Sequence, residues 1–216
     1  PYRPQDRGFE ESVWFPSSHI GSVSDFWGND YFDDTYWHNG KKQKYEGYCT
    51  DIFFSESKRF IEESMDQGKP FFAYISTNTP HGPLYPKEED YKVLEKLFDK
   101  SEFAGEKGLK SRLVKYLAMI RNIDSNIGDL TDFLNDKGVI DDTIIIFLTD
   151  NGSTMGKSYF NAGMRGMKTE LWEGGHRVPL FIKWVNGNFK NTGKEVEGLC
   201  KVTDILPTLV ELCGLN

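Results

Sequence analysis

The sequence predicts an α/β fold in which helices cover both faces of a mainly parallel sheet. Segments with helical apolar spacing alternate along the chain with short apolar runs, which is the pattern of strand–helix–strand units. Polar and glycine-rich residues follow these runs, as they do at the carboxyl edge of an open sheet, where ligands bind. At 216 residues, the chain is long enough for one domain with a core of its own.

The first part of the chain differs in composition from the rest. Residues 1–48 are rich in aromatic residues, Gly, Asp and Asn and show no clean period, so a long ordered loop region held by aromatic side chains is expected there. Residues 49–216 are expected to form the α/β core.

Helices are expected where apolar residues recur every three or four positions and a helix-ending residue follows. Gly68 and Pro70 close the first such segment, Gly138 caps the third, and Thr203 is the expected N-cap of the last. The expected helices cover residues 51–65, 87–100, 109–137 and 203–213.

Three short apolar runs are predicted to be strands. Residues 143–148 are β-branched and uninterrupted, as expected of a strand buried on both faces. Residues 71–75 and 178–182 are the other two, and the proline near the start of the last run is tolerated at that position.

Composition excludes several classes of function. The net charge of −7 argues against a nucleic-acid backbone as the main partner. No apolar stretch reaches the length of a membrane span. Three cysteines, Cys49, Cys200 and Cys213, form no metal-binding pattern and are expected to act as small apolar side chains. The opening lacks an initiator Met and an apolar leader, which suggests a piece of a longer protein.

Three polar groups follow the predicted strands and are expected to open onto one cleft. His81 lies in a loop stiffened by Pro80 and Pro83, where it can bind an anion or protonate a leaving oxygen. Asp150 and Asn151 supply hard oxygens that suit Ca²⁺ or Mg²⁺.

The third group is Lys168, in a glycine-rich loop, which can hold a sulfuryl or phosphoryl oxygen. Glu173, before Gly174 and Gly175, is interpreted as a structural acid that holds Arg165, Arg177 or backbone amides. Each group also has a plainer interpretation: a surface histidine for His81, a turn for Asp150 and Asn151, and an exposed lysine for Lys168.

Together these segments resemble the sulfatase family of the alkaline-phosphatase-like superfamily. The resemblance covers most of the chain, and its motifs occur in a consistent order. They are Gly47-Tyr48-Cys49-Thr50-Asp51, Pro80-His81-Gly82-Pro83, Ile123-Asp124-Ser125-Asn126-Ile127-Gly128, Thr149-Asp150-Asn151-Gly152, Arg165-Gly166-Met167-Lys168 with Glu173-Gly174-Gly175, and Thr203-Asp204-Ile205-Leu206-Pro207.

The resemblance implies hydrolysis of a sulfate ester by a formylglycine nucleophile with Ca²⁺ as cofactor. Asp150 and Asn151 would then be metal ligands, and His81 and Lys168 would be the catalytic and substrate-binding residues at the sulfate. The implied substrate is a sulfated small molecule or glycan. The implied location of the parent protein is the periplasm or the exterior of the cell.

The sequence also departs from the family pattern. No Cys or Ser is followed by the x-Pro/Ala-x-Arg sequence from which formylglycine is made. The pairs Asp33-Asp34 and Asp141-Asp142 do not follow apolar strands, so neither replaces the family's first aspartate pair. The chain is therefore expected to be an N-terminally truncated catalytic domain without a nucleophile. We expect it to be inactive alone, to bind Ca²⁺ weakly or not at all, to pair with the missing N-terminal segment and to self-associate.

Two other functions fit parts of the sequence. A phosphodiesterase or phosphoryl transferase of the same superfamily would use more His and Asp metal ligands, and only four histidines are present. A non-catalytic domain that binds sulfated glycan or protein is the second alternative.

Overall fold

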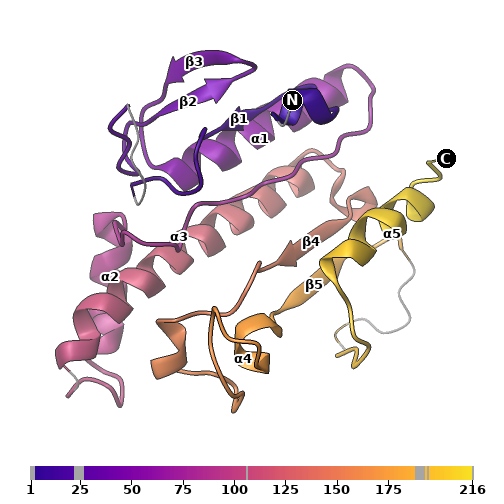
Figure 1. Ribbon diagram of the computed structural model, residues 1–216. Helices are drawn as coiled ribbons and strands as arrows, with labels where there is room; N and C mark the ends of the chain where they lie inside the picture. The colour runs from indigo at the N-terminus through magenta and orange to yellow at the C-terminus, as the bar shows by residue number, and fades with distance from the viewer. Residues whose placement is uncertain (1–2, 22–26, 106, 188–192, 194, 216) are drawn as a thin grey trace.

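The computed structural model describes residues 3–21, 27–105, 107–187, 193 and 195–215. Five α-helices and five strands occur in these residues, and Figure 1 labels them. The strands are β1 (Val13–Trp14), β2 (Thr35–His38), β3 (Lys41–Lys44), β4 (Ile145–Leu148) and β5 (Leu180–Lys183). The helices are α1 (Cys49–Asp66), α2 (Glu88–Phe98), α3 (Lys107–Asp136), α4 (Glu173–His176) and α5 (Ile205–Leu212).

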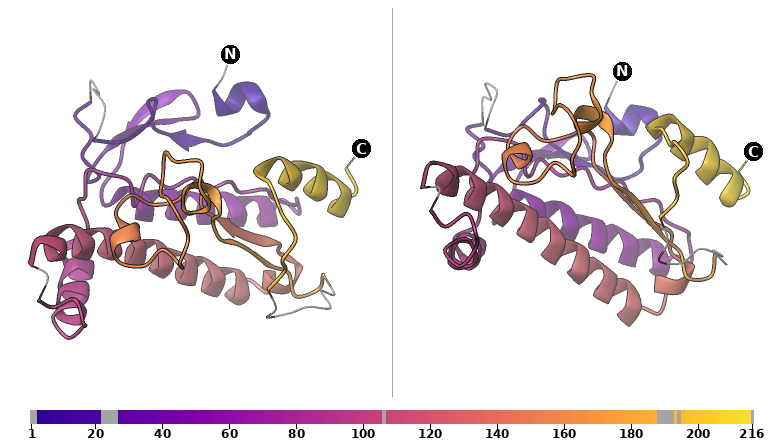
Figure 2. Two further views of the ribbon diagram at one scale, coloured as in Figure 1. Left: turned by 60° about the horizontal axis from the view of Figure 1, so that its bottom comes forward. Right: turned by 90° about the horizontal axis from the view of Figure 1, so that it is seen from below.

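The helices and strands form layers. Figures 1 and 2 show α1 and α3 side by side in one layer, with the β4–β5 ribbon in front of them and α5 beyond the ribbon. The chain returns from the end of α1 as an extended segment that carries the His81 loop. Helices thus lie on both sides of the β4–β5 ribbon (Figures 1 and 2), although all four residues of β5 remain exposed.

The predicted long helices form close to their expected bounds. α1, α2, α3 and α5 correspond to the four segments with helical apolar spacing. Gly138 ends α3 in the left-handed conformation, with φ of 70°, and the Val139 amide donates to the Leu134 carbonyl at 3.0 Å. No described helix is long and apolar enough to cross a lipid bilayer.

The prediction of a mainly parallel sheet is wrong for the described residues. β1, β2 and β3 form one antiparallel sheet, and β4 pairs with β5 antiparallel, Ile146 opposite Ile182. The three-stranded sheet lies within the region expected to be loop, of which residues 22–26 are outside the described part. Apolar runs predict strands but carry no information about the direction of the neighbouring strand.

Two predictions of strand burial are also wrong. Residues 71–75 are extended but belong to no described strand, and Phe72 and Tyr74 are exposed. β4 is not buried on both faces, since its last two residues, Phe147 and Leu148, are more than a third exposed. A strand is buried only when further strands or helices cover it, and the described residues place β5 alone beside β4.

The main core is aromatic and joins the first 48 residues to α1 and α3. Its largest buried members are Tyr31, Tyr36 and Tyr48, which pack with Ile20 and Met119. Cys49 is buried in the same cluster, and burial raises the pKa of its thiol to about 12. Cys49 therefore behaves as predicted, whereas Cys200 and Cys213 are exposed free thiols.

A carboxylate fastens the helices to one another. Asp51, in the first turn of α1, accepts hydrogen bonds from Asn122 and Asn126 of α3 at 2.8 and 2.7 Å. Its other oxygen accepts from Lys87 Nζ, just before α2, at 2.8 Å. This network fixes the positions of α1, α3 and the start of α2 relative to one another.

Candidate active site

The His81 loop is tied to the core at both backbone and side-chain level. Tyr31 Oη donates to the His81 carbonyl at 2.7 Å, and the buried Thr79 hydroxyl lies 2.8 Å from Thr50 Oγ1 at the start of α1. His81 Nδ1 lies 2.8 Å from the Gly82 carbonyl oxygen. Because a carbonyl can only accept, Nδ1 carries the proton, and Nε2 is the ring nitrogen left for a ligand.

A second histidine, which no motif in the sequence marks, lies against this loop. The ring of His19 stacks on that of His81, with centroids 3.9 Å apart and planes 23° apart. Its loop is anchored by the buried Ile20, whose amide donates to Asn78 Oδ1 at 3.0 Å. The sequence Ser17-Ser18-His19-Ile20-Gly21 has no period or motif that would have marked His19.

Asp150 and Asn151 follow β4 directly, as predicted, and Gly152 then meets α4. The Gly152 amide donates to the Gly175 carbonyl at 3.0 Å. A Cβ on Gly152 would lie 1.9 Å from the Gly174 carbonyl oxygen, so no other residue fits there without displacing the backbone. The loop that carries Asp150 is therefore packed directly on the turn that contains Gly174 and Gly175.

The same two glycines hold the loop of Lys168. A Cβ on Gly174 would lie 2.4 Å from the Gly166 carbonyl oxygen, and one on Gly175 would lie 2.2 Å from the Glu170 carbonyl oxygen. The Gly174 amide donates to the Arg165 carbonyl at 2.8 Å. The sequence predicted a tight turn here, and the structure forms a single helical turn whose glycines join the Lys168 loop to the Asp150 loop.

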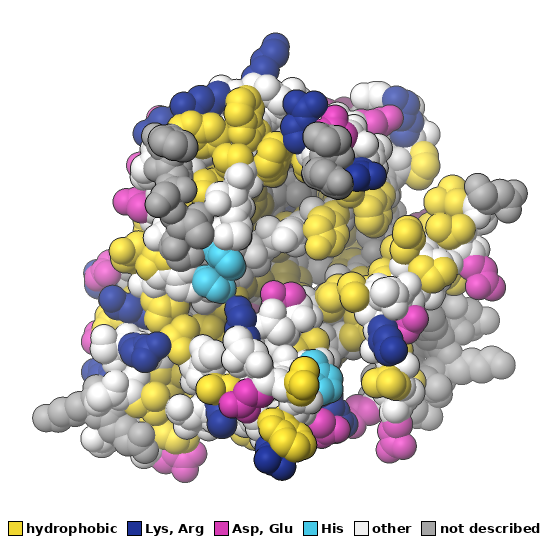
Figure 3. All heavy atoms as spheres, viewed as in Figure 1, with side chains coloured by type: hydrophobic (Ala, Val, Ile, Leu, Met, Phe, Trp, Pro, Cys, Tyr) yellow, Lys and Arg dark blue, Asp and Glu magenta, His cyan; other side chains and the backbone are white. Residues whose placement is uncertain are grey.

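Residues of all three predicted groups influence the pKa of one side chain, that of His19. Partial burial lowers the pKa of His19, the positive charges of His81 and Lys168 lower it further, and the carboxylate of Asp150 acts in the opposite direction. His81, Lys168 and Asp150 are thus all close enough to His19 to interact with it electrostatically. Figure 3 shows histidine side chains gathered beside a basic side chain on this hollowed face of the molecule.

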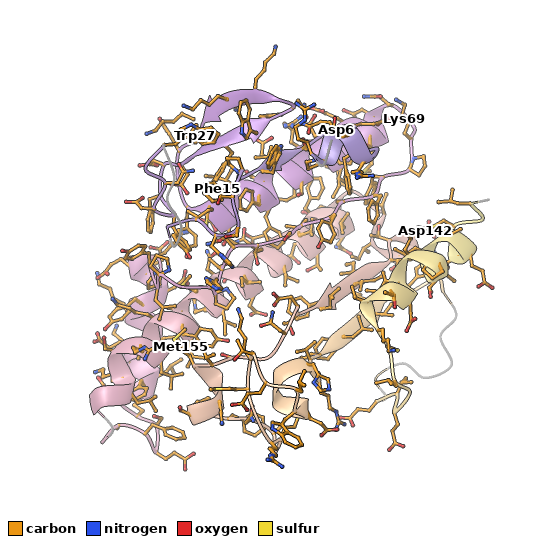
Figure 4. The ribbon with its side chains drawn as sticks, in the orientation of Figure 1. Asp6, Phe15, Trp27, Lys69, Asp142 and Met155 are labelled. Carbon is orange, nitrogen blue, oxygen red and sulfur yellow. The ribbon has the colours of Figure 1, made fainter. Side chains whose placement is uncertain are left out.

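The oxygens of Asp150 and Asn151 suit a hard cation, but they are few. Asp150 is exposed and Asn151 half-buried, and Ca²⁺ takes six to eight oxygen ligands. Figure 4 places Asp142 at the other end of β4, where it accepts a hydrogen bond from Asn186 Nδ2 at 2.6 Å. Asp34 is buried in the aromatic core and accepts from Tyr36 Oη at 2.8 Å.

A separate acidic and histidine cluster lies between β1, β2 and α1. Glu11, His38 and Glu56 bring potential metal-ligating atoms within 4.8 Å of one another. Arg59 already forms ion pairs with both carboxylates, at 2.9 Å to Glu56. The guanidinium supplies the positive charge that a metal ion would bring, so the cluster is an ion-pair network in this structure.

Glu173 matches part of its predicted role. Its carboxylate lies 3.4 Å from Arg177 Nη1. Arg165 instead stacks on the ring of Trp172, with its guanidinium carbon 3.4 Å from the ring centroid. Glu173 therefore pairs with Arg177 at the end of its own turn, whereas Arg165 is held by Trp172.

The sequence profile of the sulfatase family matches residues 5–215. The chain belongs to the sulfatase family. Two curated sulfatases align with the whole chain, an uncharacterised sulfatase, YdeN, of Escherichia coli and an ulvan-active sulfatase of Formosa agariphila. The first is 23% identical and the second 28% identical to this chain.

Solved structures agree with the family. The crystal structure of Ps i-CgsB in complex with k-i-k-neocarrahexaose superimposes on the whole chain with a TM-score of 0.81 and 27% identity. This likeness supports the α/β, alkaline-phosphatase-like fold. The sulfatase chain described here spans 48% of that structure and 35% and 41% of the two curated relatives. Sulfatases hydrolyse sulfate esters and generally use a metal ion.

Proposed function

We propose that this chain forms part of the active site of a sulfuric ester hydrolase. The observation that carries the proposal is the junction at Gly174 and Gly175, where the loop of Asp150 and the loop of Lys168 pack on the same turn. The electrostatic effects of His81, Lys168 and Asp150 on the pKa of His19 agree with this arrangement. A lysine and a histidine beside a carboxylate that can hold a metal ion suit the tetrahedral, singly charged sulfate group of a sulfate ester. Family membership supports the same reaction.

His81 and Lys168 would act on the sulfate group. Lys168 is a flexible point charge able to neutralise a non-bridging oxygen. His81, with Nδ1–H held by Gly82, has Nε2 available to bind the ester, and it can donate a proton to the leaving oxygen when that nitrogen is protonated. Asp150 and Asn151 would hold the cation, which when bound neutralises sulfate charge.

The nucleophile would come from another stretch of polypeptide, since no Cys or Ser here precedes an x-Pro/Ala-x-Arg sequence. The apolar surface of the strands supports such a partner. Phe181 and Ile182 of β5 are 63% and 49% exposed, and Leu206 of α5 is 70% exposed. Exposed apolar surface of this kind marks an interface with other protein.

The proposed substrate is a sulfated glycan. Among the relatives, one is called ulvan-active, and one solved neighbour binds a neocarrahexaose. A hollow of about 400 Å³ is lined in part by residues that follow His81 in the sequence, Leu84, Tyr85 and Pro86, and by the half-exposed ring of Phe32. Aromatic walls with a few polar groups are typical of sites that bind organic ligands.

The proposal is tested by binding and by turnover. We expect 4-nitrophenyl sulfate to shift the NMR signals of His81 in the isolated chain and 4-nitrophenyl phosphate to shift them less. A stronger response to the phosphate ester would favour the phosphodiesterase alternative instead. Lys168→Ala should weaken the sulfate response, and the exposed Lys157→Ala serves as the matched control.

We expect the isolated chain to show no hydrolysis of 4-nitrophenyl sulfate, because binding without a nucleophile does not lower the barrier. Turnover that copurifies with the chain and is lost in His81→Ala would show that a nucleophile exists here. In a longer chain that also carries the nucleophile, Lys168→Ala should lose about 2–4 kcal/mol of transition-state stabilisation, as for one preorganised donor.

A further inference from the structure

We propose that His19 is a positioning residue for His81, a role that rests on the proposed function of the His81 ring. The two rings stack nearly parallel with their centroids 3.9 Å apart, so His19 covers one face of His81. His81 is also held at one edge, where Nδ1 meets the Gly82 carbonyl. A ring fixed at one edge and over one face presents Nε2 in a single direction.

The loop of His19 is built to hold that contact. Ile20 is 1% exposed, and its amide donates to Asn78 Oδ1 three residues before His81. Gly21 lies so close to Pro83 that a Cβ there would be 3.0 Å from the proline ring. The loop of His19 therefore docks on both sides of His81, and His19 Nδ1 is itself 3.1 Å from Ser18 Oγ.

The charge of the neighbourhood suits a neutral ring at position 19. Two stacked imidazolium rings would repel each other, whereas a neutral ring can stay stacked when His81 gains a proton. A positive charge on His19 would also be repelled by the positive charge of Lys168. His19 can thus hold the ring of His81 without competing for the proton that His81 carries.

The experiment is NMR of the four histidine rings in the full chain, with His19→Ala, His19→Phe and, as a control, the exposed His176→Ala. Loss of the stacked ring should move the His81 signals in His19→Ala, and Phe should restore close ring contacts to His81. Binding of 4-nitrophenyl sulfate should weaken about two- to tenfold in His19→Ala, the scale of one side chain that must be immobilised on binding. His19→Phe should bind nearly as the original chain does.

Unchanged His81 signals in a folded His19→Ala would overturn the proposal, as would equal loss in the Ala and Phe variants. If the original chain binds no aryl sulfate, yet its His81 signals depend on an aromatic ring at position 19, the positioning role stands and the proposed function fails. Circular dichroism checks that each variant is folded.

Discussion

Gly152 and Gly174 are in backbone contact, so close that a Cβ on Gly152 would lie 1.9 Å from the Gly174 carbonyl oxygen. This contact joins the loop of Asp150 to the turn that also holds the loop of Lys168. Two of the three proposed sulfate-site loops therefore share one junction of glycines, and their relative position depends on the absence of side chains there.

Gly152→Ala should destabilise the fold by about 1–3 kcal/mol, the usual cost of forcing extra atoms into a packed site. Gly128→Ala is the matched control, because Gly128 is an exposed position in α3 with open space around its missing Cβ. There alanine should stabilise by about 0.5–1 kcal/mol through its better helix propensity. Urea unfolding measures both, and equal effects at the two positions would contradict the packing argument.

Asp51→Ala should lower the free energy of unfolding by about 1–3 kcal/mol at pH 7, since it leaves the amides of Asn122 and Asn126 without their shared acceptor. Asp124→Ala, at an exposed position of α3, is the control. Urea unfolding measures how far each variant differs from the original chain in its free energy of unfolding, and Asp124→Ala should differ little.

The same network predicts a pH dependence. Burial raises the pKa of the Asp51 carboxyl, but the bonds from Lys87, Asn126 and Asn122 outweigh it, so the net pKa is lowered. As the pH falls, Asp51 therefore binds a proton in the unfolded chain before it does so in the folded chain. The stabilisation from its charge is present above the ordinary carboxyl pKa of 3.8 and is lost as the pH falls through the lower pKa of the folded chain. The difference between the original chain and Asp51→Ala should shrink between pH 5 and pH 2. A difference independent of pH would show that the charge of Asp51 contributes nothing.

Calcium binding by the isolated chain should be weak, with a Kd above about 1 mM, because Asp150 and Asn151 supply only two of the six to eight oxygens that Ca²⁺ takes. Isothermal titration calorimetry measures it, with Asp150→Ala and the exposed Asp129→Ala as a matched pair. Micromolar binding that disappears only in Asp150→Ala would show that further ligands complete the site.

The chain should self-associate through the exposed apolar face of β4, β5 and α5. Phe181→Glu places a charge on that face and should shift the light-scattering mass toward the monomer. Val93→Glu, at an exposed apolar position of α2, should leave the mass unchanged. A monomer at all concentrations in the original chain would count against this interface.

The helices and the position of Asp150 could be predicted from the sequence because their signals are local. α1, α2, α3 and α5 form where apolar residues repeat at helical spacing, and Asp150 follows its strand as expected. Helix periodicity and turn residues act over a few positions of the chain, so they can be recognised without knowing what packs nearby.

The pairing of the strands and the place of His19 could not be predicted from the sequence, because they depend on distant neighbours. Residues 71–75 have the composition of a strand, yet they pair with no described strand, and β4 gains an antiparallel partner in β5. His19 had no local signal at all, since its place beside His81 depends on Ile20 reaching Asn78, 58 residues further along the chain.

The sequence by itself determined the helices, the family and the chemical types at the site, because each rests on residue identity and short spacing. Only the tertiary structure decided which loops meet, how the strands pair and which apolar faces stay exposed. Those outcomes depend on backbone contacts between distant segments, such as Gly152 against Gly174, where the fit is set by the space that other segments leave.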